Sequence, residues 1–247
     1  MRIMALIFPN YVPVDTIHIA GLAIGTIVLI VVLFELVRWR GVLAPIAKAS
    51  RLGVVKWWAI FVNTLADDVI YQQISTKCPD RRWFSHSLVF WGFIMLSAST
   101  ALDYVTNAAG GALPLVDPVR ILGNLGGVLL IAGLAIVLYQ IIVDGDKREV
   151  TFAPDYLFIG LLLLAGLTGF LSEYASEINA VAWIYGVYVV HLLSSAALLL
   201  LAPFTRFIHA FGRPIIRLSE RYLEALNRKG IVIPSEITVV PILGQGE

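Results

Sequence analysis

The chain contains four histidines, and each lies within or at the end of a strongly apolar stretch. Two of them, His191 and His209, are eighteen residues apart in the stretch at 187–214. On one continuous helix this spacing is roughly five turns, so both imidazoles are expected on one face, about 27 Å apart along the axis. Imidazole is costly inside a membrane and is usually kept for a function. Two on one stripe therefore predict two stacked metal or haem sites.

The elements that would position these histidines are five apolar stretches, each long enough for a hydrocarbon core of roughly 30 Å. They lie at 15–37, 83–104, 119–143, 155–174 and 182–209. With 59% hydrophobic residues, 14% charged residues and a mean hydropathy of +0.85, the composition lies outside the range of soluble globular proteins. We therefore predict an all-α integral membrane protein built as a five-transmembrane-helix bundle.

Basic residues indicate the orientation of this bundle. Most lysines and arginines fall between the first two stretches, between the third and fourth, and after the fifth, whereas the opposite side has little more than Arg2 and Arg120. The positive-inside rule then puts the N-terminus outside and the C-terminus in the cytoplasm. The net charge of +1 conceals this asymmetry, and no nucleic-acid partner is expected.

With this orientation the histidines fall at two depths. His18 and His191 lie near the outer surface, and His86 and His209 near the inner surface. A b-type haem needs two axial imidazoles from different helices at one height. The sequence therefore offers His86 with His209 for an inner haem and His18 with His191 for an outer haem, both between helices. The alternative is that backbone carbonyls or interfacial water satisfy these side chains.

Other segments suggest how the chain is organised. An amphipathic stretch at about 53–75 predicts a helix on the membrane surface with tryptophans at headgroup depth. We expect one transmembrane domain at 1–226, including this helix, and a cytoplasmic C-terminal tail at 227–247. Glycines inside the apolar stretches, such as Gly21, Gly25 and the group at 123–133, predict close helix packing.

Three polar side chains near the apolar stretches are candidates for chemistry. Arg206, three residues before His209, could pair with a haem propionate or with a lipid phosphate. Asp103 and Glu173 lie near the predicted outer surface, where quinol oxidation would release protons, so either carboxylate could accept them. The alternative for both is an ordinary solvated helix end.

The single cysteine, Cys78, limits what the chain can carry. It excludes a disulfide within the chain, a covalent CxxCH haem site and an iron–sulfur cluster held by this chain alone. If clusters take part in electron transfer, a partner subunit must carry them.

Two motifs resemble known membrane cytochromes. The run HLLSSAALLLLAPFTRFIH, followed by Pro214, resembles the last helix of respiratory nitrate reductase gamma subunits, which are five-helix di-haem cytochromes b. The motif RRWFSHSLVFWGF and the long stretch before it resemble the cytochrome b subunit of heterodisulfide reductase and related membrane subunits of sulfite-reduction complexes. The resemblance implies His191 and His209 as haem ligands, with His86 as the inner partner.

One position departs from the nitrate reductase gamma pattern. Those subunits carry a second histidine ten residues further along the second helix, where this chain has Leu96. Either His18 takes that place at the outer haem, or only the inner haem is present. We favour His18, because its expected depth matches that of His191.

The resulting hypothesis is a di-haem b-type cytochrome in the cytoplasmic membrane of a prokaryote. It would transfer electrons between a menaquinone-type quinone and a cytoplasmic iron–sulfur subunit, with CCG-type cysteine motifs in the heterodisulfide reductase branch. Within the redox class, the cytochrome b of hydrogenase or formate dehydrogenase is a competitor. The alternative from another class is a non-redox membrane anchor or transporter with a histidine proton relay, although the sequence has no visible inverted repeat.

Overall fold

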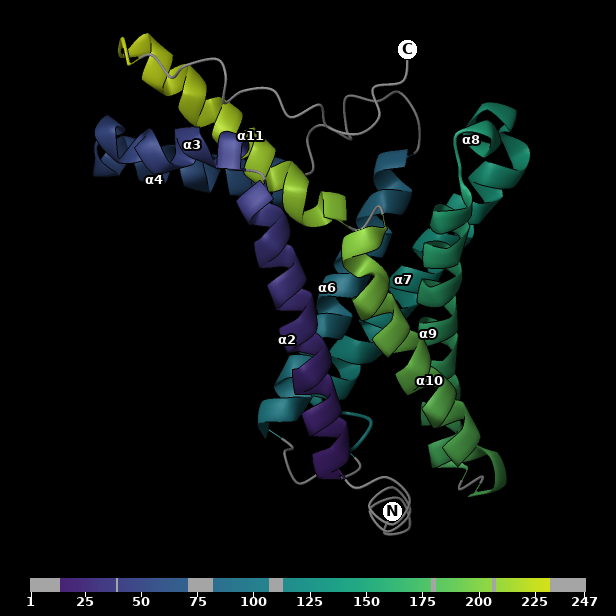
Figure 1. Ribbon diagram of the computed structural model, residues 1–247. Helices are drawn as coiled ribbons and strands as arrows, with labels where there is room; N and C mark the ends of the chain where they lie inside the picture. The colour runs from purple at the N-terminus through teal and green to yellow at the C-terminus, as the bar shows by residue number, and fades with distance from the viewer. Residues whose placement is uncertain are drawn as a thin grey trace. The chain divides into compact units, whose positions relative to one another are not determined.

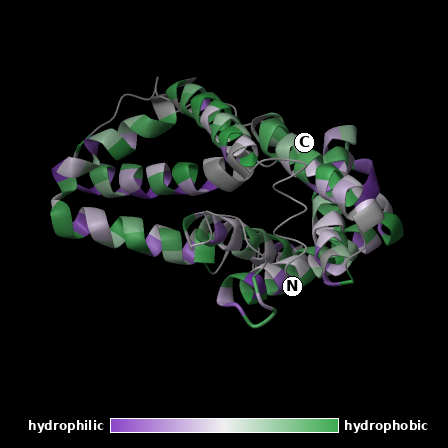
Figure 2. Cartoon of the chain, turned by 90° about the horizontal axis from the view of Figure 1, so that it is seen from below, coloured by the Kyte–Doolittle hydropathy of each residue, from purple (hydrophilic) through white to green (hydrophobic). Residues whose placement is uncertain are grey.

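The computed structural model describes residues 14–38, 40–70, 82–106, 113–178, 181–205 and 208–231. These residues form helices and short connections, and no strand occurs among them. Four helices are long and apolar enough to cross a membrane, at Thr16–Glu35, Trp83–Thr106, Pro118–Val143 and Ala153–Ala175, and a shorter apolar helix covers Tyr185–Leu201. Hydrophobic residues, green in Figure 2, make up much of the surface of the long helices. The predicted all-α, multi-pass membrane architecture is confirmed.

The chain divides into two compact units. The first unit contains Met1–Ile27 and Cys78–Thr205, and the second contains Val28–Lys77 and Arg206–Glu247. The segment 1–226, treated above as one domain, therefore includes parts of both units. Its limits stay a prediction.

The first unit is built from two pairs of neighbouring helices. Helix α6 (Arg82–Thr106) packs along α7 (Pro118–Val143), and α9 (Ala153–Glu177) packs along α10 (Val181–Leu201), as Figure 1 shows. Helix α7 also contacts α9 and so joins the two pairs. The shared core consists of four buried leucines, Leu130 and Leu134 on α7, Leu162 on α9 and Leu198 on α10.

Glycines set the close approach of α6 and α7. A Cβ atom added to Gly92 would lie 2.5 Å from the backbone nitrogen of Leu130, and one added to Gly126 would lie 2.9 Å from the carbonyl oxygen of Gly92. A Cβ at Gly133 would lie 2.8 Å from the backbone nitrogen of Val89. Only residues without a side chain fit at such distances, so the close packing predicted for the glycines at 123–133 is confirmed.

Local sequence signals explain where α7 begins and ends. Asp117 precedes the helix, and its side chain accepts a hydrogen bond of 2.9 Å from the Val119 amide, with Pro118 at the first helical position. After Val143, Asp144 has extended backbone angles and starts the short helix α8 (Gly145–Glu149). This short connection makes α7 and α9 neighbours.

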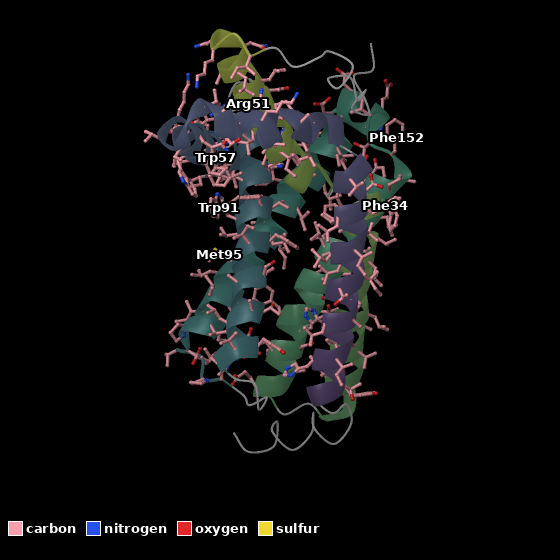
Figure 3. The ribbon with its side chains drawn as sticks, turned by 60° about the vertical axis from the view of Figure 1, so that its left-hand side comes forward. Phe34, Arg51, Trp57, Trp91, Met95 and Phe152 are labelled. Carbon is pink, nitrogen blue, oxygen red and sulfur yellow. The ribbon has the colours of Figure 1, made fainter. Side chains whose placement is uncertain are left out.

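Helix α2 (Val14–Arg38) begins in the first unit and ends in the second. Its apolar side chains are exposed almost all round, with Phe34 64% exposed (Figure 3). A helix that is hydrophobic on all sides needs lipid or other helices around it. Added Cβ atoms at Gly21 and Gly25 would meet no described atom within 4 Å, so the packing predicted at these two glycines is not confirmed.

The second unit is an assembly of shorter helices. Helix α3 (Arg40–Lys48) and a 3₁₀ turn, η1 (Ala49–Leu52), precede α4 (Val54–Thr64), which continues as a π-helical turn, η2 (Leu65–Ile70). Helix α11 (Ile208–Arg228) packs on α3 and α4 (Figure 1). Its core is formed by buried residues of η1 and α11: Ala49, Leu52, Tyr222, Ala225 and Leu226.

Hydrogen bonds tie α11 to the rest of the second unit at two places labelled in Figure 3. The Tyr222 hydroxyl donates to the Trp57 carbonyl at 3.0 Å, and Lys229 Nζ donates to the Arg51 carbonyl at 2.6 Å. Between η1 and α4, Gly53 has φ +88°, a conformation that favours glycine.

Helix α4 and η2 occupy most of the amphipathic segment predicted at 53–75, and residues 71–75 lie outside the described part. The side chains of Val54, Val55 and Trp58 are exposed on this unit. The position of the segment on the membrane surface stays a prediction.

The predicted continuous helix at 182–209 is wrong. Helix α10 ends at Leu201, a 3₁₀ turn covers Ala202–Phe204, and Thr205 has extended backbone angles of φ −112° and ψ 177°. Pro203 explains the break, because proline lacks an amide hydrogen and disfavours the α conformation in the residue before it. His191 and His209 therefore belong to different helices, α10 and α11, and the helical periodicity that put them on one face does not apply.

Candidate functional site

His191 lies in the middle of α10, half-buried against α9. Its Nδ1 atom is 2.9 Å from the carbonyl oxygen of Ala165, and 3.4 Å from the hydroxyl oxygen of Thr168. The Thr168 hydroxyl itself donates to the Leu164 carbonyl at 2.5 Å. A carbonyl oxygen can only accept a hydrogen bond, so Nδ1 carries the proton. In the neutral ring, Nε2 then holds the lone pair, as a metal ligand requires.

His18 lies near the start of α2, half-buried. Its ring meets that of Tyr104 on α6 edge to face, with ring centroids 4.7 Å apart. The neighbours of His18 thus come from α6, whereas those of His191 come from α9. The predicted pairing of His18 with His191 at an outer haem stays a prediction.

His86 lies in the first turn of α6, half-buried, and stacks on Phe90 one turn later, with centroids 6.5 Å apart. His209 is a backbone member of α11 whose side chain lies outside the described residues, and Arg206 lies outside them altogether. His86 and His209 also belong to different units. The inner pair and the propionate role of Arg206 therefore stay predictions.

Glu173 is part of a charged network between α7 and α9. Its Oε1 atom accepts hydrogen bonds from Arg120 Nε at 2.6 Å and from Asn124 Nδ2 at 3.0 Å. Arg120 also donates to Glu177 at 2.6 Å and to the Leu113 carbonyl at 2.9 Å. The Arg120 side chain is only 15% exposed, so this network ties the two helices together at one end of the unit.

Asp103, the second predicted proton acceptor, is half-buried near the end of α6, next to Tyr104. An electrostatic interaction links it to Tyr188 on α10, one turn before His191. The structure thus brings Asp103 near α10, and Tyr104 near His18. Leu96, where the gamma-type pattern has histidine, packs against the leucine core of the first unit.

Sequence reasoning missed the partners of two of these residues. From the sequence, Arg120 contributed only to the count of basic residues on the outer side. It lies in the first turn of an apolar helix, and two glutamates lie four residues apart at the end of the next long helix. This pattern predicts an ion pair. The contact of His191 with α9 has a weaker signal in the sequence, which is the glycine at position 169.

Among the described residues, no cluster of three or more His, Cys, Asp or Glu side chains could hold a metal ion. A b-type haem does not need such a cluster, since its iron takes one axial side chain from each of two helices.

The chain is similar to several oxidoreductase subunits. It is 24% identical over 208 residues to a subunit of the dihydromethanophenazine:CoB–CoM heterodisulfide reductase of Methanosarcina acetivorans, covering 71% of this chain and 77% of that protein. It is 25% identical over 134 residues to the respiratory nitrate reductase 2 gamma chain of Escherichia coli K12, covering 44% of this chain and 59% of that one. These matches support the resemblance to heterodisulfide reductase cytochrome b subunits and nitrate reductase gamma chains, at low identity.

The chain is also similar to citrate utilization protein B of Escherichia coli, 35% identical over 140 residues that cover 54% of this chain and 35% of that protein. No family model matches the chain, and no solved structure matches it. The resemblance seen in the second and last apolar stretches is confirmed at low identity, and with four candidate spans the chain is a multi-pass membrane protein.

Proposed function

We propose that the chain is the b-type cytochrome subunit of a membrane-bound respiratory oxidoreductase, with α10 as its fifth span. It would pass electrons between a menaquinone-type quinone and a cytoplasmic iron–sulfur subunit. The observation that carries the proposal is the contact of His191 on an apolar helix, where Nδ1 lies 2.9 Å from the Ala165 carbonyl. Since the carbonyl can only accept, Nδ1 donates, and the neutral ring keeps its lone pair on Nε2. Similarity to the two reductase subunits supports the same assignment.

The residues of this chain fit a haem in two respects. A ligating histidine normally donates its other ring N–H to a carbonyl or carboxylate, as His191 does toward Ala165. In addition, His18, His86, His191 and His209 lie on four different helices, α2, α6, α10 and α11. This distribution suits bis-imidazole ligation, which takes one histidine from each of two helices.

We assign His18 and His191 to an outer haem, and His86 and His209 to an inner one, with Arg206 near a propionate of the inner haem. Haem bound at these positions would supply one-electron redox chemistry. The break at Pro203 puts His209 on a different helix from His191. The two proposed ligands therefore need not lie on one helix face.

At the quinone, the chain must handle protons, because oxidation of a quinol to a quinone releases two electrons and two protons. Asp103 is our first candidate for an acceptor, given its position beside Tyr104 and its interaction with Tyr188. Glu173 already accepts two side-chain hydrogen bonds, so its first role is to hold α7 to α9. Glu173 could accept a proton from quinol only if its hydrogen bond with Arg120 were first broken.

The partners follow from the same proposal. A single cysteine cannot hold a cluster, so the iron–sulfur centres would belong to another subunit, with CCG-type motifs in the heterodisulfide reductase branch. The complex would lie in the cytoplasmic membrane of a prokaryote, with the N-terminus outside.

The test is haem content, measured by pyridine haemochrome on the purified complex. We expect two b-type haems per chain, one of them lost in His191→Ala and the other in His209→Ala. Val190→Ala, a change at the exposed neighbour of His191 on α10, is the matched control and should keep both. A wild-type chain without haem would contradict the proposal and favour the histidine relay of a non-redox membrane protein.

A further inference from the structure

The imidazole of His191 rests on a short stretch of the α9 backbone. Three groups of one α9 turn define this place, which we call the α9 seat: the Ala165 carbonyl and the Thr168 hydroxyl, which lie near Nδ1, and Gly169, where an added Cβ would meet the ring. In an α-helix the carbonyl of residue i points toward residue i+4, which here is Gly169. The carbonyl that holds the ring is therefore flanked by the residue with no side chain.

Gly169 makes room for the ring. A Cβ atom at this position would lie 3.3 Å from Cε1 and 3.6 Å from Nδ1 of His191, and no other described atom would come within 4 Å of it. The first distance is shorter than ordinary van der Waals contact between carbons, which is about 3.5–4.0 Å. A side chain at 169 would require the His191 ring to shift by a few tenths of an ångström.

The carbonyl fixes the tautomer as well as the orientation of the ring. It accepts from Nδ1–H at 2.9 Å, so the proton stays on Nδ1 and the lone pair on Nε2. A hydrogen bond of this kind raises the basicity of the opposite nitrogen and limits rotation of the ring. The α9 seat thus leaves the lone pair on Nε2, the nitrogen that would be available to a metal ion.

We propose that Gly169 and the Ala165 carbonyl are positioning groups for His191, setting the ring plane, tautomer and ligand strength of one axial haem ligand. The inference rests on the proposed function, since it takes His191 as a ligand of haem iron. Neither group touches iron. They act through the imidazole, and hydrogen bonding to an axial ligand is one of the factors that set a haem's reduction potential.

The experiment compares two glycine-to-alanine variants of the same helix in the purified complex. Gly169→Ala adds a methyl group against His191. Gly160→Ala adds one where no described atom lies within 4 Å, so it controls for the change in helix propensity. His191→Ala reports separately whether this residue is a ligand.

Three measurements are made: haem content, the low-spin EPR and redox titration of each haem, and the rate of haem transfer to excess apomyoglobin. In Gly169→Ala we expect the haem to be retained, with a shifted EPR signal and midpoint potential for one haem only, and about tenfold faster transfer of that haem. Gly160→Ala should match the wild type in all three.

The outcomes separate the two levels of the proposal. If His191→Ala loses one haem but Gly169→Ala behaves as Gly160→Ala does, His191 is a ligand and the positioning role of the α9 seat is overturned. If His191→Ala keeps both haems, the ligand assignment fails and the positioning role fails with it. If Gly169→Ala changes both haems equally, the effect is a general loosening of the bundle, which also contradicts the proposal.

Discussion

The two helix pairs of the first unit both use glycine at their contacts, for different purposes. Between α6 and α7, an added Cβ at Gly92 would strike the backbone of Leu130 at 2.5 Å. Between α9 and α10, an added Cβ at Gly169 would meet only the His191 ring, at 3.3 Å. In the first pair glycine sets the distance between two backbones, and in the second it seats a side chain that can do chemistry.

The difference matters because a backbone in a packed helix cannot yield, whereas a ring can turn. Substitution in the first pair should therefore change stability, and substitution in the second should change the properties of the proposed haem ligand His191. The variants below test that division, beginning with the largest expected effect.

Gly92→Ala should be strongly destabilising. The new methyl group would overlap the Leu130 amide and the Gly126 carbonyl, so α6 and α7 would have to separate. Overpacking typically costs about 1–3 kcal/mol, and a clash with the α7 backbone at two residues should cost at or above the upper limit. Thermal unfolding of the purified protein measures the loss, with Gly160→Ala as the control. Equal stability of the two variants would show that the close approach is not what holds this pair.

Arg120→Met should cost about 2 kcal/mol, because it removes charged hydrogen bonds to Glu173 and Glu177 and leaves two carboxylates near each other. This variant tests whether polar contacts between α7 and α9 contribute as much stability as the glycines.

Among single changes at the carboxylates, Glu173→Gln should cost more stability than Glu177→Gln, since the Glu177 side chain is more exposed, at 48% against 26% for Glu173. The reverse order would mean that the network forms mainly at the exposed end.

Gly127→Ala should have a smaller effect, about 1 kcal/mol, because its Cβ would meet the end of the Phe170 ring at 2.7 Å and that side chain can move. The second change Phe170→Leu shortens the opposing side chain, so the double variant should recover part of the loss. A double-mutant cycle on thermal stability gives the coupling between the two positions. Simple additivity would contradict the contact.

The sequence predicted the spans well where apolar length alone decides them. The stretches expected at 83–104, 119–143 and 155–174 are the cores of α6, α7 and α9. The prediction failed at Pro203, where hydropathy continues but the backbone cannot, and the expected helix to 209 ends at Leu201. Apolar character sets what enters the membrane, and proline sets where a helix stops.

The sequence predicted which residues form the candidate site better than it predicted which residues they contact. His191 and Glu173 were both identified as polar groups in apolar surroundings. Their contacts to Ala165 and Arg120 join residues 26 and 53 positions apart, on neighbouring helices. Such pairs depend on how α9 is rotated and spaced relative to α7 and α10. The periodicity of apolar residues within one helix does not predict how that helix is rotated against its neighbours.

The smallest expected effect lies at the other end of α7 from Arg120, outside the membrane-spanning segments. Asp144 Oδ2 is 3.2 Å from Lys147 Nζ, and the hydrogen bond from that side chain lowers the pKa of Asp144 below its usual range. A lowered carboxyl pKa stabilises the fold at pH values above the unfolded-state pKa, about 3.9, and this contribution disappears as the pH falls through the folded-state value.

Asp144→Asn keeps a side chain that can cap α8 and removes only the charge. We therefore expect a slightly lower unfolding temperature than the wild type at pH 7 and convergence of the two as the pH falls through the folded-state pKa of Asp144. Asp146→Asn removes the same charge from the same turn and should shift the unfolding temperature less at pH 7. For Arg120→Met the difference from the wild type should also shrink at low pH, because Glu173 and Glu177 become protonated, but loss of the hydrogen bond to the Leu113 carbonyl should leave part of the destabilisation. Asp144→Asn could instead destabilise the protein more than Arg120→Met does. The surface ion pair at the end of α7 would then contribute more stability than the part-buried ion pairs at its start, contrary to the expected difference between exposed and packed contacts in this unit.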